Sequence, residues 1–271
     1  MKNKIFRKKI FIPLFKTYLL EFKLRWKRIL IIIIIFLIFS ISLILFYPYH
    51  FDVGEFLQDE LGYFKIFITF ISSFFFSDII CDEYNKKTGY IVFPKISKFT
   101  LIAGKYFSNL SVTIMLIVFY YLILNISAVL VYDTVIIEIL LSFGIAILYT
   151  ITLSIIILFL SAILPNANLI SIFFILISFI GFPMMEQVLT VINQEIEPIF
   201  SLNYIGNLIV YTIPGGLINN RRWTWVYYAG DTLPPVKMWL TPTIGIGILI
   251  PIIYIVIFMF LALVLIERKE F

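Results

Sequence analysis

The sequence predicts an all-α membrane protein with six transmembrane helices, on three observations. Of its 271 residues, 62% are apolar and 14% are charged, whereas soluble domains have about 45–50% apolar and about 25% charged residues. Several stretches longer than ~18 residues carry no charge, which is long enough to cross a bilayer as a helix. Ten of the 21 Lys and Arg residues come before the first of these stretches, within residues 2–28. A water-soluble protein with a single core is therefore excluded.

The basic segment 1–28 is expected to form an amphipathic helix on the cytoplasmic surface of the membrane. Its Phe, Ile and Leu residues are mixed with lysines, so apolar side chains can enter the acyl boundary while the cations face lipid headgroups. The apolar run that follows is too long for a signal peptide, and no Ala-x-Ala site comes after it. Calmodulin-like or nucleic-acid binding is the alternative for such a basic helix. Because the cations flank a span, membrane lipid is the expected partner and nucleic acid is not.

Six segments of about 17 to 25 residues with few or no charges are predicted to cross the membrane. The second has Lys65 near one end and Asp78 near the other, and both side chains can snorkel to an interface. The fourth and fifth are separated only by Pro165-Asn166-Ala167-Asn168, which predicts a tight helical-hairpin turn. The predicted spans are 29–47, 63–80, 110–132, 139–164, 169–185 and 244–266.

The distribution of cations predicts that both termini are cytoplasmic. With six crossings, segment 1–28, the loop 79–106, the turn at Pro165 and the C-terminal tail lie inside, and they hold 17 of the 21 Lys and Arg residues. The four cations left outside are Lys65, Arg221, Arg222 and Lys237. The positive-inside rule therefore favours a multi-pass protein of the plasma membrane with the N-terminus and C-terminus inside. The resulting units are 1–28, 29–185 with the loop 79–106, 186–243, and 244–271 with the sixth helix and tail.

The region 186–243 is predicted to be extracellular, with re-entrant or interfacial helices between spans five and six. Its charge-free part, 198–220, is long enough for a seventh crossing, but its Asn, Gly and Pro residues favour irregular backbone shielded by protein. Aromatic residues gather beside Arg221 and Arg222. They are explained by an aromatic belt at the outer leaflet, or by a cap on the exit path of an apolar or amphiphilic substrate. These residues are Trp223, Trp225, Tyr227 and Tyr228.

The predicted spans contain no Asp, Glu, Lys, Arg or His near mid-membrane. Ion-coupled carriers usually place an ionisable group at depth, so that class is disfavoured. Intramembrane proteolysis is also disfavoured, because the spans hold no Ser–His pair, pair of deep aspartates or zinc site. One cysteine and one histidine exclude a disulfide framework and predict no metal site.

The loop 79–106 resembles the membrane subunits of type-2 ATP-binding-cassette (ABC-2) exporters. That family shows a Glu at the end of span two, a Gly-Thr-like turn, a Pro-(Ile/Val)-Ser-Arg element and a Gly-Lys seven residues after the Arg. Here the corresponding residues, in the same order, are Glu83, Thr88-Gly89, Ile96-Ser97-Lys98 and Gly104-Lys105. Three departures are visible: the Thr-Gly order is reversed, Pro94 stands one residue early, and Lys98 replaces Arg. The basic N-terminal segment, six spans, long fifth external loop and charged tail also match the family pattern.

The resemblance implies that the loop is a coupling helix seated in a groove of a separate ATPase subunit. An ordinary basic loop on anionic headgroups is the alternative. No Gly-x-x-x-x-Gly-Lys-Ser/Thr motif occurs in the chain, so this chain is not expected to be an enzyme, and ATP and magnesium are expected on the partner. The residues implied in coupling are Asp82, Glu83, Tyr84, Lys86, Lys87, Thr88, Gly89, Pro94, Ser97, Lys98, Gly104 and Lys105.

The function expected from this resemblance is that of the permease subunit of an ATP-driven exporter of an apolar, amphiphilic or peptide substrate. Two ATPase subunits and a second permease chain, identical or homologous, would complete the assembly. No catalytic residue and no bound cofactor are expected on the chain itself. Two other classes stay open: a non-transporting membrane scaffold or immunity protein, and an ion-coupled carrier.

Overall fold

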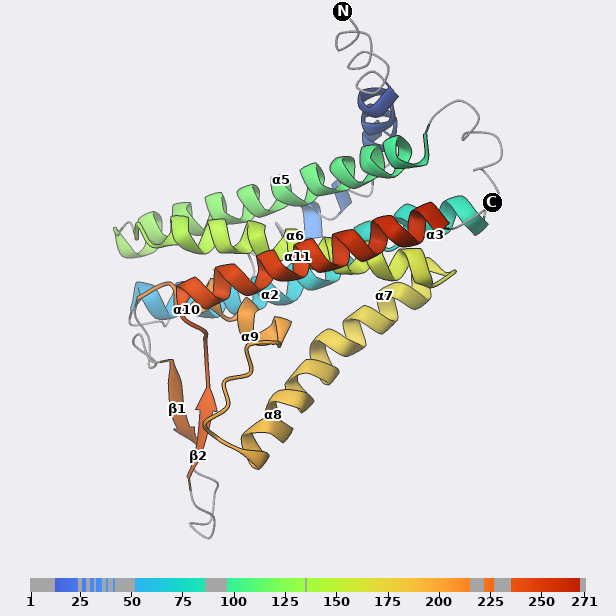
Figure 1. Ribbon diagram of the computed structural model, residues 1–271. Coiled ribbons are helices and arrows are strands. Elements are labelled where there is room, and N and C mark those ends of the chain that lie inside the picture. The colour runs from blue at the N-terminus through green and yellow to red at the C-terminus, as the bar shows by residue number, and fades with distance from the viewer. Residues whose placement is uncertain are drawn as a thin grey trace, which may run out of the picture.

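The computed structural model describes residues 13–23, 52–85, 97–134, 136–214, 222–226 and 235–268, with scattered positions between 26 and 41. The long helices are α2 (Val53–Phe76), α5 (Lys98–Tyr132), α6 (Ile139–Ile163) and α11 (Ile244–Arg268). Figure 1 shows these four running lengthwise beside one another. Within the described residues, five helical stretches are long and apolar enough to span a membrane. The protein is therefore a membrane-embedded helical protein.

The core lies where α6 packs against α2, α5 and α11. The aromatic rings of Phe64 on α2 and Tyr120 on α5 stack with centroids 4.1 Å apart. Hydroxyl groups join the helices: Tyr106 and Ser154 hydrogen bond at 2.9 Å, and the Ser161 hydroxyl donates to the Ser77 carbonyl. Such bonds replace water in a bilayer, where packing and interhelical polar contacts drive association.

Helix α2 begins ten residues earlier than the sequence predicts, at Val53 rather than at residue 63. It is followed by α3 (Asp78–Asn85), and the apolar stretch Val53–Cys81 is 29 residues long. The early start follows from a helical repeat of buried apolar residues, Phe56, Leu57, Leu61, Phe64 and Ile68, which outweighs the acidic residues used to end the predicted span. Lys65 therefore lies twelve residues inside the helix, about 18 Å from its start.

The first predicted span, 29–47, lies mostly outside the described residues, although its described positions up to residue 41 are helical. The third span is also longer than predicted, because α5 begins at Lys98 instead of residue 110. Its start is fixed by the Ser97 side chain, which accepts a hydrogen bond from the Thr100 amide and so caps the helix. Its end is marked by Asp133, which adopts the left-handed conformation.

The fifth predicted span is a helix in three parts: α7 (Ala167–Leu176), the π-helical turn η1 (Ile177–Gly181) and α8 (Phe182–Ile192). The Asn166 side chain accepts a bond from the Asn168 amide and caps α7, as the predicted hairpin turn requires. The π-turn ends two residues before Pro183, which supplies no amide proton to the helix. Because α8 continues to Ile192, Glu186 belongs to a helix.

The α7–α8 helix diverges from the four long helices in Figure 1. Only 22% of its most apolar window is buried, against 67% for the stretch Val53–Cys81, and α11 is still more exposed at 11%. These two helices carry apolar surfaces that the described residues leave uncovered. In a membrane protein such surfaces face lipid or another chain.

Between α8 and α11 lie two short helices, α9 (Leu202–Gly206) and α10 (Leu208–Tyr211), and two antiparallel strands, β1 (Trp223–Val226) and β2 (Val236–Trp239). Helices of five and four residues are too short to cross a bilayer, so the described part of 198–220 contains no seventh crossing. The strand pair is not predicted by the sequence analysis. Figure 1 shows it projecting away from the long helices.

Residues 13–23 of the basic N-terminal segment are helical, with Phe15, Leu19 and Leu20 exposed. This helix meets the first turns of α5 (Figure 1). It agrees with the predicted helix over the part that is described; residues 1–12 lie outside that part.

Candidate functional site

Gly104 and Lys105, which the family resemblance places in the coupling element, contact the chain's own N-terminal helix. A Cβ atom at position 104 would lie 2.8 Å from the Thr17 Cβ and 3.2 Å from the Leu14 carbonyl oxygen. Only glycine allows this approach without a shift. The Lys105 side chain is buried beside it, with Nζ 3.7 Å from the Glu21 carboxylate. This contact, the N-terminal joint, ties residues 13–23 to α5.

The other predicted coupling residues fall into two groups. Ser97 and Lys98 are described: Ser97 caps α5, and Lys98 is the helix's first residue. Asp82, Glu83 and Tyr84 lie in α3, so the helix from α2 continues to the motif. The remaining five lie outside the described residues: Lys86, Lys87, Thr88, Gly89 and Pro94. The coupling role of all twelve residues stays a prediction.

The structure places Lys65, which is partly buried, well inside the candidate span Val53–Cys81, and not at a span end as the sequence predicts. Lys65 Nζ donates to the side-chain oxygens of Asn203 on α9 and Asn207 after it, at 3.0 and 2.6 Å. A buried ammonium needs such acceptors, because losing water without replacement is costly. Span two was predicted from a segment with few charges. This criterion set the start of the helix ten residues too late, so it did not predict that Lys65 lies inside the helix.

Glu186 on α8 completes this site through an asparagine bridge. Asn203 accepts from Lys65 with its oxygen and donates with its nitrogen to the two Glu186 oxygens, at 3.3 and 3.4 Å. The Ser201 hydroxyl also donates to Glu186. Lys65, Glu186, Asn203 and Asn207 are called the Lys65 cluster below. It joins α2, α8 and the α9–α10 pair by hydrogen bonds that need a cation at their centre.

Close backbone approaches hold α9 and α10 against this cluster. A Cβ atom at Gly206 would lie 3.0 Å from both the Lys65 Cδ and the Tyr149 Cζ. Gly247 on α11 is in turn covered by the Leu208 side chain. The Asn207 amide nitrogen donates to the Leu240 carbonyl at 2.8 Å. The short helices are therefore packed among α2, α6 and α11.

A second ionisable group, Glu60, is buried in α2. It is 4% exposed, and the Tyr120 hydroxyl lies 3.0 Å from one of its carboxylate oxygens and from its backbone carbonyl. The predicted span two begins at residue 63, which leaves this acid in the loop before it. Like Lys65, it was missed because the span was defined by its freedom from charge.

The strand pair is anchored to the loop after α8 by ion pairs and aromatic contacts. Arg222 Nη2 lies 2.7 Å from both carboxylate oxygens of Glu197, which also accepts from the Tyr204 hydroxyl at 2.8 Å. Burial, and then the adjacent Glu197 carboxylate, raises the pKa of Tyr204 above its ordinary value. The neutral hydroxyl is therefore the form that this site favours.

Lys237 on β2 lies over two indole rings, 4.5 Å from the Trp239 centroid and 5.2 Å from that of Trp223. Its ammonium also pairs with the exposed Glu195 carboxylate at 3.0 Å. The cations of the strand pair are thus partnered within the protein, and cation–π contacts of this kind stabilise an exposed aromatic surface.

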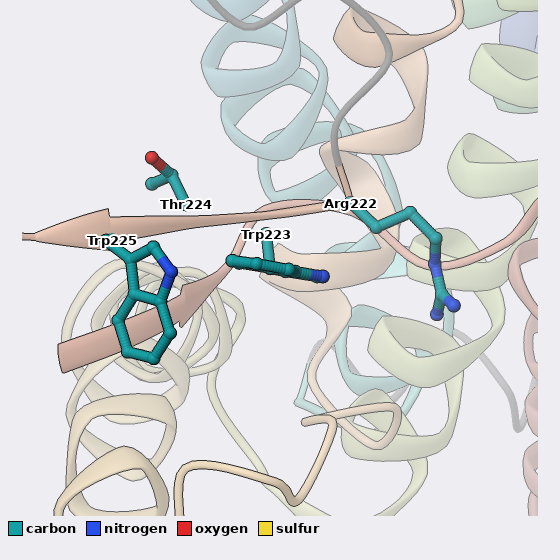
Figure 2. A pocket seen from close by; sticks show the side chains of 4 residues that line it. All are labelled: Arg222, Trp223, Thr224 and Trp225. Atoms are coloured by element: carbon teal, nitrogen blue, oxygen red, sulfur yellow. The ribbon is translucent and has the colours of Figure 1, made fainter.

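Figure 2 shows the hollow beside β1, which has a volume of about 300 Å³ and is lined by four consecutive residues. Trp223 and Trp225 meet edge to face at 5.7 Å, while Arg222 points away from them (Figure 2). Both predicted exit-path tryptophans are therefore brought together and part-exposed, at 39% and 45%. Tyr227 and Tyr228 lie outside the described residues.

Among the described residues, no group of three or more His, Cys, Asp or Glu side chains is arranged to hold a metal ion. Comparison of the sequence with protein-family models gives no match, and comparison with curated proteins gives none. The assignment of a function therefore depends on the residues and their geometry alone.

Proposed function

We propose that the chain is the permease subunit of an ATP-driven ABC-2 type exporter in the plasma membrane. The observation that carries the proposal is the motif from Glu83 to Lys105, whose residues follow the same order as in the family. This motif connects two candidate membrane spans of a highly apolar chain. A separate ATPase, in two copies, binds ATP and magnesium and engages this motif. A second permease chain, identical or homologous, completes the transporter, and the substrate is apolar, amphiphilic or a peptide.

The geometry of α2 and α3 supports a mechanical role for this motif. Lys65 lies twenty residues before the end of α3 at Asn85, which corresponds to about 30 Å along a helix. A displacement of the motif by a partner would therefore be transmitted to the Lys65 cluster along α3 and α2, which are nearly continuous. On the other side of the motif, α5 begins at Lys98 and carries the N-terminal joint.

The first test is whether the neighbouring gene encodes an ATPase with a phosphate-binding loop; that ATPase is then co-expressed with the chain, and the two are purified in lipid. We expect the ATPase to co-purify, and its ATP turnover to rise in the presence of the chain. Replacing both Asp82 and Glu83 with alanine should weaken the association, because charged rims of protein interfaces fix register and partner choice. The matched control is Glu267→Ala, an acid near the C-terminus. An ATPase that neither binds nor responds would refute the proposal.

An ion-coupled carrier is the second candidate, and the presence of the buried Glu60 and the partly buried Lys65 inside α2 favours it. Ionisable groups within spans commonly mark ion pathways. Proteoliposomes containing the chain alone distinguish the two candidates. Substrate flux driven by a proton or sodium gradient without any ATPase would establish the carrier and exclude the exporter.

A further inference from the structure

Lys65 connects two parts of the chain that are far apart in sequence. Its acceptors are 138 and 142 residues away, on the α9–α10 segment. The Asn203 amide extends the connection to Glu186 on α8. Both amides are oriented by the ammonium: each turns its oxygen toward Lys65 and donates its nitrogen elsewhere, to Glu186 and to the Leu240 carbonyl. A neutral, apolar side chain at position 65 would leave both oxygens without their donor.

The position of α9 and α10 depends on such contacts more than on their own backbone bonds. Helices of four and five residues are not stable alone, because nucleation is not repaid over so short a length. Gly206 has no side chain, which lets α9 approach the stem of Lys65 and the ring of Tyr149. Close packing at Gly206 and the hydrogen bonds of the Lys65 ammonium thus hold α9 at the same place.

We propose that Lys65 is a positioning residue that latches the α8–α10 segment onto α2, and that this latch carries movement of α2 to that segment. The first statement concerns this chain alone. The second rests on the proposed function, because a partner ATPase would supply the movement. In the latched state the polar groups of the cluster satisfy one another; in the released state they take up water.

The latch is tested by thiol labelling. The background is Cys81→Ser, which removes the chain's single cysteine, and Ile205→Cys then places a thiol on α9 where the native side chain is 1% exposed. The protein is reconstituted in lipid vesicles and treated with a maleimide. Release of the latch exposes the polar groups of the cluster to water. Removing one member of a buried charged set is strongly destabilising, so Lys65→Met should accelerate labelling by about tenfold or more. Lys65→Arg, which restores a cation, should bring the rate back toward that of the parent.

The matched control is Lys237→Met, the same change at a lysine paired with a carboxylate that is 77% exposed. It should leave labelling of the thiol on α9 unchanged. If Lys65→Met does not fold, Asn207→Ala, which removes one acceptor, decides the matter by the same measurement. The latch is overturned if the labelling rate is unchanged in Lys65→Met, or in Asn207→Ala where that variant is used. It is also overturned if the rate rises equally in the control.

The second statement is tested with the ATPase present. Lys65→Met should leave co-purification of the ATPase intact while transport per ATP hydrolysed falls by about tenfold, which separates a positioning role from a loss of assembly. Transport per ATP equal to that of the unaltered chain would overturn the transmission role. Absence of any bound ATPase would instead refute the proposed function, and the labelling result would still decide whether the latch exists.

Discussion

The N-terminal joint makes a quantitative prediction for Gly104→Ala. The added Cβ would lie 2.8 Å from the Thr17 Cβ, whereas carbon atoms in contact are optimally about 3.5–4.0 Å apart. The N-terminal helix must therefore retreat from α5 by roughly 1 Å. Overpacking of this kind costs about 1–3 kcal/mol, and the better helix propensity of alanine recovers about 0.8–1.0 kcal/mol. The net expectation is a loss of about 1 kcal/mol at the joint.

Hydrogen exchange followed by mass spectrometry measures this loss locally. A change of 1.4 kcal/mol is tenfold in an equilibrium constant, so amides of residues 13–23 and of the first turns of α5 should exchange several-fold faster in the variant. The Lys105–Glu21 contact, already 3.7 Å long, should lengthen further. The structure offers a matched control in Gly144, a glycine within α6 whose added Cβ would have no neighbour within 4 Å.

Gly144→Ala should stabilise its helix by about 0.5–1 kcal/mol, because it only relieves the entropic cost of glycine. The two substitutions are chemically identical, so opposite effects would isolate the contact with Thr17. If Gly104→Ala leaves the exchange of residues 13–23 unchanged, or slows it, the joint is not formed in the protein and the reasoning fails.

Three further predictions concern the region between α8 and α11. Gly247→Ala should lower the thermal midpoint because its Cβ meets Leu208, and adding Leu208→Ala should restore part of the loss, with a coupling of about 0.5–3 kcal/mol between the two changes; strict additivity of the two midpoint shifts would contradict the packing. Tyr204→Phe should flatten the alkaline loss of stability. Because the folded-state pKa of Tyr204 is raised, its contribution is complete below the unfolded value of about 10 and falls as pH rises toward the folded value; unfolding curves of both proteins between pH 8 and 11 check this, and parallel curves would exclude it. Replacing Trp223 and Trp225 with alanine should reduce substrate efflux in the reconstituted transporter while leaving ATPase binding intact, if the tryptophans cap an exit path; unchanged efflux would assign them to the aromatic belt.

The class of the protein was predictable because it depends on properties summed over many residues. Long runs without charge predicted the helices at 139–164 and 244–266 within two residues of α6 and α11. The Pro165 turn was also located correctly, because proline and asparagine act through local backbone chemistry. Such signals need no knowledge of neighbouring helices.

The residues of the candidate site were not predictable in this way. Glu60 and Lys65 counted against a span, yet α2 contains both, because other helices supply a hydroxyl donor to Glu60 and amide acceptors to Lys65. Those acceptors lie as far as 142 residues along the chain, and no local pattern relates Asn207 to Lys65. The strand pair was missed for a similar reason: each strand has only four residues, and its anchoring bonds to Glu197 and Gln194 come from the loop after α8.

The two joints together suggest why a displacement of the segment between α3 and α5 would have distant effects. Both helices that flank this segment are held at one point by a contact that tolerates little change: α2 by the Lys65 cluster and α5 by Gly104 against Thr17. Lys65 is about 30 Å from the end of α3, while Gly104 is about 10 Å from the start of α5. A small rotation of the residues between α3 and α5 would therefore move the N-terminal helix over a short distance along α5. It would move the α8–α10 segment over a longer distance along α3 and α2. Loss of the Gly104 joint should affect coupling without changing access to α9, and loss of Lys65 should expose α9 without freeing residues 13–23. Labelling of the thiol on α9 and hydrogen exchange of residues 13–23, both measured in both variants, separate these effects. If either substitution produces both changes, the N-terminal joint and the Lys65 cluster act as one unit, and their separate roles are refuted.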